Sequence, residues 1–403
     1  MGGAAAPWAP QPQIPLIYSG AAATFGRALA FSSSMLELFV GAPGGDAGGY
    51  YVFSFLRPNA TAEWLPGDTY TCPTADCTSG SQFGASLALS ADGSIMAVGA
   101  PRSGAYGAVY VFSRRANSTA LFTHTATLAS PDHTEFASFG ARIAMTPAMT
   151  GGVLIVSAPG GIYGRQGSVH IFSASSGGRK WTHRTAIGNP TDANLCSFGG
   201  SLALAPDARI LAIGAPGEGV ARLYALSAGG GSATLLAKLT GAGGLFGGAL
   251  ALSAAADGIL SVAIGAPGNP SYFQNGTVTV FSNVTLGRFY PVAAIALGEN
   301  ANDAFGAALA YDSDGAALIV GAPGANGGAG AVLVYPTDTW AAAQTLQPAA
   351  AVKFAADFGA ALALWRNASD SSAPVALALG APSSGSYRGA VETYVRSAGK
   401  FGK

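Results

Sequence analysis

One short pattern returns seven times along the 403-residue chain and constrains its fold more than any other feature. Its clearest copy is the segment 83–113, FGASLALSADGSIMAVGAPRSGAYGAVYVFS. A Phe-Gly pair opens an alternating apolar segment, an Asp-Gly turn follows, a second apolar segment ends in Gly-Ala-Pro, and a third begins after Gly107. Short apolar runs bounded by such turn residues are typical of β-strands. Each copy therefore predicts three strands joined by tight turns.

The two halves of the pattern keep their order throughout the chain. The Phe-Gly pairs begin at Phe25, Phe83, Phe139, Phe198, Phe246, Phe305 and Phe358. The Gly-Ala-Pro signature follows at Gly41, Gly99, Gly214, Gly265, Gly321 and Gly380, and Ser157-Ala158-Pro159 replaces it in the third copy. A weaker fourth strand precedes the next Phe-Gly pair in most copies. Units of four strands and 48 to 59 residues are typical of β-propeller blades.

The two ends of the chain predict how the ring of blades closes. Only seven residues follow Arg396, too few for a fourth strand, while the segment Ile14–Tyr18 stands where a fourth strand precedes the first Phe-Gly pair. Closure by an N-terminal strand hides sheet edges that an open array would expose. We therefore expect one all-β, seven-bladed propeller over residues 14–397, with a tail or linker at 1–13 and a C-terminal tail at 398–403.

Charge, hydropathy and motif content exclude several classes of protein. The 20 basic residues balance the 20 acidic ones, so nothing electrostatic favours binding to nucleic acid or an anionic membrane. The most apolar windows, such as 245–256, are shorter than the roughly 20 residues of a membrane helix. The four histidines, His124, His133, His170 and His183, follow no metal-binding spacing, and the chain has no G-x-S-x-G elbow. A non-catalytic protein without direct membrane insertion is expected.

Acceptor sequons and cysteines bear on the cellular compartment. Five N-x-[ST] sequons favour an extracellular or cell-surface glycoprotein, and they lie at Asn59, Asn117, Asn275, Asn283 and Asn367. Residues 1–13 lack the features of a secretory signal, so the chain is either not secreted or a segment of a longer protein. Cys72 and Cys77 are close enough to close a small disulfide loop in an oxidising compartment, and unpaired thiols are the alternative.

The repeated order of Phe-Gly and Gly-Ala-Pro resembles the FG-GAP repeat of the integrin α-subunit β-propeller and of related extracellular propellers. The resemblance covers residues 14–396 and implies an adhesion or recognition role, with a protein or glycan ligand and another subunit of a surface complex as partners. A lectin-type propeller and an accessory module of a larger protein are the alternatives. In that family the ligand face is built by the loops between the second and third strands and by those entering the next Phe-Gly.

Transferred by position, that face includes residues from both kinds of loop. The loops between second and third strands contribute Asp46, Arg102, Tyr106, Tyr163, Arg165, Glu218, Tyr272, Phe273, Asn326, Tyr387 and Arg388. The loops entering Phe-Gly contribute Asp68, Tyr70, Asp132, His133, Asp192, Glu299, Asp303 and Asp357. Aromatic and arginine side chains on one rim are what a recognition surface tends to use.

The resemblance also implies calcium in the hairpin between the first and second strands, held by an Asp-x-Asp-x-Asp-Gly-x-x-Asp loop. The sixth copy keeps Asp312 and Asp314, but Ala310 and Leu318 occupy the outer ligand positions. Calcium takes six to eight oxygen ligands, and Asp-Gly is by itself a favoured hairpin turn. We expect calcium binding to be weak or absent, with Asp312 and Asp314 as weak candidate ligands and Asp92-Gly93 as a turn.

Overall fold

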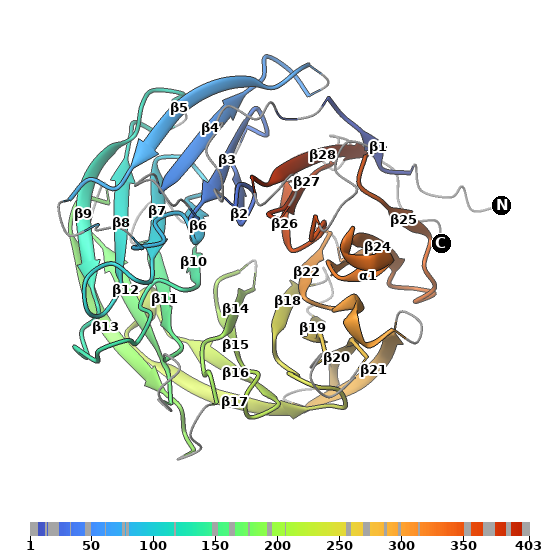
Figure 1. The fold of residues 1–403 in the computed structure, drawn as a ribbon. Helices are drawn as coiled ribbons and strands as arrows, with labels where there is room; N and C mark the ends of the chain where they lie inside the picture. Colours follow the sequence, from blue (N-terminus) through green and yellow to red (C-terminus); the bar gives the residue numbers. More distant parts are fainter. Residues whose placement is uncertain are drawn as a thin grey trace.

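The chain forms a ring of seven four-stranded antiparallel sheets, so the predicted seven-bladed propeller is confirmed (Figure 1). The structure is a computed structural model. It describes residues 7–396 except 13, 15–23, 33, 45–49, 61, 75–76, 78–79, 117, 147–151, 161–165, 176–177, 192–195, 206, 255–258, 269–274, 286–287, 297–299, 313–314, 350–355, 366–374 and 384–387. Among these residues, no helix is long and apolar enough to cross a membrane.

Each blade begins with a short inner strand at the centre of the ring and ends with an outer strand (Figure 1). Blades one to three are β2 (Ala28–Phe31), β3 (Glu37–Ala42), β4 (Tyr51–Leu56), β5 (Leu65–Thr71); β6 (Ser86–Leu89), β7 (Ile95–Ala100), β8 (Ala108–Ser113), β9 (Thr123–Ala129); and β10 (Ile143–Met145), β11 (Val153–Ala158), β12 (Ser168–Ala174), β13 (Trp181–Gly188).

Blades four to seven continue the same order around the ring. They are β14 (Ser201–Leu204), β15 (Ile210–Ala215), β16 (Val220–Leu226), β17 (Ala233–Thr240); β18 (Ala249–Ala254), β19 (Leu260–Ala266), β20 (Thr277–Thr285), β21 (Arg288–Ala296); β22 (Ala308–Tyr311), β23 (Ala317–Ala322), β24 (Ala331–Pro336), β25 (Gln344–Leu346); and β26 (Ala361–Trp365), β27 (Val375–Ala381), β28 (Ala390–Arg396) with β1 (Ala9–Pro10). Short helical turns are η1 (Ala228–Gly230), η3 (Ala301–Asp303) and α1 (Ala325–Gly328).

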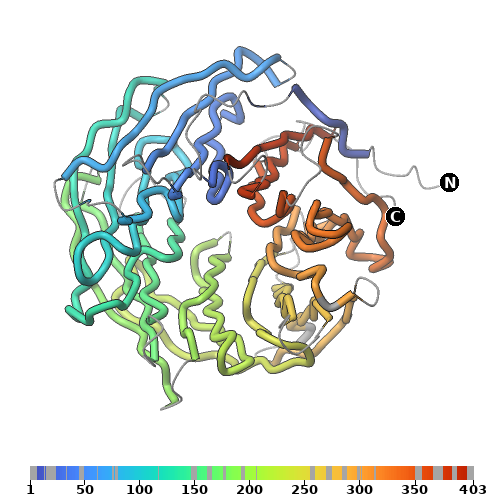
Figure 2. Tube along the Cα trace, in the orientation of Figure 1, coloured from blue at the N-terminus to red at the C-terminus, as the bar shows by residue number. Residues whose placement is uncertain are grey.

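The N-terminal strand closes the ring, as predicted, but it lies in a different place in the sequence. Strand β1 pairs with β28, with Ala9 opposite Val395, whereas the prediction placed this strand at Ile14–Tyr18 and treated residues 1–13 as a tail. Figure 2 shows β1, in dark blue, beside the red C-terminal strand. Trp8 explains the difference: its ring is 3% exposed in the core between the last two blades. Residues 15–18 of the predicted strand lie outside the described part of the chain.

The repeated motif builds the contacts between neighbouring blades. All seven Phe-Gly phenylalanines are buried, and each following glycine has φ between +87° and +94°, a conformation that side chains disfavour. The first glycine of Gly-Ala-Pro approaches the backbone of the next blade: a Cβ on Gly321 would lie 2.1 Å from the carbonyl oxygen of Gly359. The motif residues therefore set how closely neighbouring blades pack.

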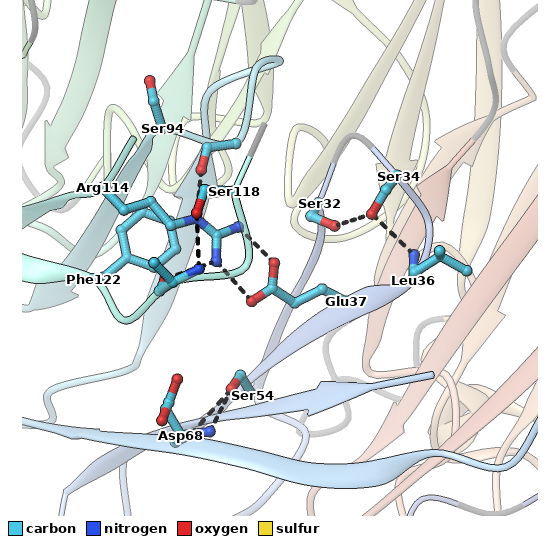
Figure 3. Close-up of polar contacts among 12 residues, drawn as sticks. Ser32, Ser34, Leu36, Glu37, Ser54, Asp68, Ser94, Arg114, Ser118 and Phe122 are labelled. Atoms are coloured by element: carbon cyan, nitrogen blue, oxygen red, sulfur yellow. Dashed lines mark hydrogen bonds and ion pairs between the residues drawn. The ribbon is translucent and has the colours of Figure 1, made fainter. Parts of the chain in front are cut away.

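A buried ion pair joins the first two blades (Figure 3). The guanidinium of Arg114 donates to both carboxylate oxygens of Glu37, at 2.5 and 2.9 Å, and both side chains are less than 5% exposed. The same guanidinium lies 4.1 Å from the ring centroid of Phe122 and donates to the carbonyl of Gly93. This contact adds a charged link to the apolar packing between these two blades.

The antiparallel order of strands separates two ends of the ring. Loops between second and third strands and loops entering the next blade gather at one end, which we call the loop face. Loops between first and second strands and between third and fourth strands gather at the other end, which we call the hairpin face. The loop face carries the residues that the sequence predicted as ligand contacts.

Candidate functional site

A hollow of the loop face, about 600 Å³, lies over the sixth blade. It is enclosed by the loop entering β22, the loop between β23 and β24, and the end of β25. Its polar lining is dominated by side-chain amides, each of which carries a donor and an acceptor. The polar lining residues are Asn300, Asn302, Asp303, Asn326, Thr345 and Gln347.

Close backbone packing fixes the two loops that form this hollow. The amide of Gly324 donates to the carbonyl of Asp303 at 3.0 Å, and a Cβ on Gly324 would lie 1.7 Å from the carbonyl oxygen of Asn302. Only glycine fits that approach. Asn326 follows in the left-handed region with φ +55°, and its side chain donates to the carbonyl of Gly330. Helical turns α1 and η3 are thereby held side by side.

Asp303 is the charged group of the hollow. Its side chain is largely buried, and this burial raises the pKa of the carboxyl, although a hydrogen bond from Asn300 opposes the rise. A buried carboxylate favours a ligand that donates a hydrogen bond, because such a donor restores solvation lost to burial. The hollow therefore offers amides and one acid to an uncharged or hydrogen-bond-donating ligand.

A second exposed feature of the loop face is aromatic and lies where the second blade meets the third. The rings of Tyr106 and His133 pack edge to face with centroids 5.5 Å apart, and Phe136 is 57% exposed. The amide of Phe136 donates to the carbonyl of Ala105, which ties its loop to that of Tyr106. Arg102, also exposed, lies in the same loop. We call these four residues, Arg102, Tyr106, His133 and Phe136, the aromatic rim.

Two residues of the aromatic rim have unusual backbones. His133 has φ +45° and Phe136 has φ +58°, in a region where a side chain costs energy. Sequence reasoning predicted Arg102, Tyr106 and His133 for this face, but it did not single out Phe136, whose loop position before Phe139-Gly140 was the available signal.

Glu218 was predicted as a contact residue, and the structure engages it within the protein. Arg222 donates to both of its carboxylate oxygens at 2.7 Å, and the ammonium of Lys238 lies 3.0 Å away. Burial alone would raise the pKa of Glu218, but hydrogen bonds from Arg222 and Lys238 outweigh it and lower the pKa. This carboxylate neutralises an arginine that is 1% exposed, so its described contacts are structural.

Of the other predicted loop-face residues, Asp68 and Tyr70 lie within strand β5 instead of the loop that follows it, and Tyr70 is buried, so this part of the prediction was wrong. Arg388 is exposed, and its carbonyl accepts from the amide of Phe25 in the neighbouring blade. Asn326 lines the hollow, as given above. The described residues exclude Asp46, Tyr163, Arg165, Asp192, Tyr272, Phe273, Glu299 and Tyr387.

The sequons also differ in accessibility. Asn59 is exposed, whereas Asn275 and Asn283 are half-buried. The side-chain oxygen of Asn283 accepts from the amide of Leu260 at 2.6 Å. Asn117 and Asn367 lie outside the described residues.

The weak calcium candidate Asp312 has a different partner. Its carboxylate, 1% exposed, pairs with Arg396 of the last blade, while Asp314 lies outside the described residues. Within the described chain, no three His, Cys, Asp or Glu side chains converge on one point. The Asp92-Gly93 turn is confirmed: Gly93 has φ +64° and its amide donates to the carbonyl of Ser90.

The cysteines and His170 occupy structural positions. Cys72 and Cys77 are joined by a disulfide, and their Cα atoms are 6.0 Å apart. Cys196 is buried and its thiol lies 2.7 Å from the carbonyl of Gln166. The ring of His170 is buried, with Ser168 and Asp132 beside Nε2 at 2.9 and 3.2 Å. Both partners meet the same ring nitrogen, whereas a nucleophile triad needs the carboxylate on the other one.

Comparison with known proteins supports the fold alone. No family model and no curated protein matches the sequence. The structure is similar to that of Sqt1 from Saccharomyces cerevisiae, with a TM-score of 0.55, 10% identity and coverage of 97% of this chain and 99% of that one. It is also similar to a functionally unknown protein from Desulfotomaculum acetoxidans DSM 771, with a TM-score of 0.52, 12% identity and coverage of 82% and 86%.

Proposed function

We propose that this protein is a non-catalytic recognition module, extracellular or at the cell surface, that binds a protein ligand through its loop face. The seven copies of Phe-Gly and Gly-Ala-Pro that resemble the integrin α-subunit propeller favour this assignment over an unrelated propeller function. The five sequons and the Cys72–Cys77 disulfide favour an oxidising compartment. Binding another subunit of a surface complex is included in this proposal.

The aromatic rim is the observation that carries the proposal. Tyrosine, phenylalanine and arginine are enriched at the energetic centres of protein interfaces. Here Phe136 is 57% exposed and lies in a loop hydrogen-bonded to that of Tyr106, so apolar area is presented on a fixed backbone. A fixed aromatic surface loses little conformational freedom on binding, which favours affinity.

The variation among blades favours a protein ligand over a sugar pocket repeated in each blade. The loop face is aromatic beside the second blade and rich in amides over the sixth, and Glu218 of the fourth blade is engaged by Arg222. A lectin-type propeller would repeat one polar and aromatic set at equivalent positions. An irregular face matches the irregular surface of a protein.

The test is binding to arrays of purified cell-surface ectodomains and of neutral glycans by a tetramerised form of the protein. We expect retention on at least one ectodomain, and loss of about 30-fold in affinity with Phe136→Ser, which corresponds to a hot-spot cost of about 2 kcal/mol. Asn59→Ala, an exposed change on the hairpin face, is the matched control. Retention on glycans alone, or equal binding by the Phe136 variant, would contradict the proposal.

A further inference from the structure

The centre of the ring holds a small channel of about 240 Å³. Its walls are the inner strands β2, β6, β10, β14, β18, β22 and β26, one from each blade (Figure 1). Each inner strand begins directly after its Phe-Gly pair, so the first residues of these strands lie at the end of the channel that opens on the loop face.

Small residues occupy almost every position at this end of the channel. The two residues after each Phe-Gly pair give fourteen positions, of which twelve are glycine, alanine or serine. The two exceptions are Arg27 in the first blade and Arg142 in the third. Both arginines line the channel and both are solvent-exposed. Two cations in this place stand out in a chain in which only 10% of residues are charged.

No acidic residue of the described chain balances the charge of these two arginines. The described lining of the channel includes no acidic residue, and neither guanidinium forms an ion pair within the described chain. The guanidinium of Arg142 donates to the carbonyl of Ala141, at 3.1 Å. Desolvation by the surrounding protein and the charge of Arg27 lower the pKa of Arg142 to about 10, so it remains protonated at neutral pH.

We propose that the mouth of the channel binds an oxyanion, a phosphate or carboxylate group, between Arg27 and Arg142. A guanidinium presents donors in a planar fork that matches the oxygens of either group. An anion held between two cations removes their mutual repulsion. This site is separate from the aromatic rim and does not depend on the proposed protein ligand.

Calorimetric titration of the whole protein tests this inference. Inorganic phosphate and acetate are titrated separately, with sodium chloride at equal ionic strength as the reference. We expect one bound anion per chain and a loss of roughly tenfold or more in affinity with Arg27→Met or Arg142→Met, because each removes a charge-assisted contact. Arg179→Met, which removes an exposed arginine outside the channel, is the control and should bind as the original chain does.

A thermal measurement separates an anion site from a merely structural role. In chloride, each channel variant should melt at or above the temperature of the original chain. The reason is that removing one arginine removes the repulsion between the two positive charges. In phosphate, the original chain should gain stability that the variants do not. The absence of binding heat for both anions, or equal phosphate binding by the channel variants, would overturn the proposal.

Discussion

Replacing the first glycine of a Gly-Ala-Pro signature tests how the motif holds neighbouring blades together. In Gly321→Ala, the new Cβ would lie 2.1 Å from the carbonyl oxygen of Gly359, 3.1 Å from its carbonyl carbon and 3.3 Å from the Cβ of Ala308. None of these atoms belongs to a flexible side chain that could rotate away. The sixth and seventh blades must therefore move apart.

The size of that movement sets the expected cost. Restoring an ordinary contact of 3.4 Å to the Gly359 oxygen requires a shift of about 1.3 Å in the backbone of a packed interface. Overpacking a core costs typically 1–3 kcal/mol, and a clash between two backbones belongs at the upper end, about 3 kcal/mol. For a chain of this size we expect the melting temperature to fall by about 4 °C.

Differential scanning calorimetry of Gly321→Ala against Gly188→Ala is the measurement. Gly188, at the end of β13, has no atom within 4 Å of its added Cβ and no positive φ, so its substitution should leave the melting temperature unchanged or slightly raised. If both variants melt together with the original chain, the motif glycine does not set the blade spacing and the reasoning is refuted.

Two further predictions concern buried charges. Glu37→Gln leaves Arg114 buried without its charged partner and should lower the free energy of unfolding by about 3–5 kcal/mol. Part of this loss should be recovered in the double variant that also carries Arg114→Met. An unchanged midpoint of urea unfolding would contradict this prediction. Burial lowers the pKa of His170 below 6.5, with the charge of Asp132 opposing and that of His183 adding to the shift. The original chain should therefore lose stability as the pH falls from 6.5 through the lower pKa of the folded state. His170→Phe should remove this loss, which is measured as the change in melting temperature between about pH 8 and about pH 5. An equal change in melting temperature for both proteins would contradict the prediction.

The blades could be predicted from the sequence because their signals are local and repeated. Phe305-Gly306 and Gly321-Ala322-Pro323 mark the start of one strand and the end of the next at a nearly constant spacing, which fixes the strand order. The closing strand could not be placed in the same way. Residues 14–18 carry more apolar character than Ala9–Pro10, but the burial of Trp8 and its backbone hydrogen bond to Gln344, 336 residues away, decide the pairing.

The candidate site was predicted in outline only. Position in the repeat placed Arg102, Tyr106 and Asn326 on the loop face, because strand order decides at which end of the ring each loop lies. The sequence did not predict side-chain partners: Asp312 pairs with Arg396 across a blade boundary, 84 residues further along the chain. The hollow likewise brings together two loops and the end of β25, so Thr345 and Gln347 carried no local signal of their own.

A glycan placed on the loop face tests the central claim, that this face binds the ligand, most directly. Asp132→Asn creates an acceptor sequon directly before His133 of the aromatic rim, while Asn59→Gln removes the exposed sequon on the hairpin face. Both variants are produced in a eukaryotic secretory host, occupancy is checked by mass, and binding to the ectodomain found on the array is measured. We expect the glycan at position 132 to abolish binding and the Asn59 change to leave it intact. Full binding with an occupied glycan at position 132 would contradict the account.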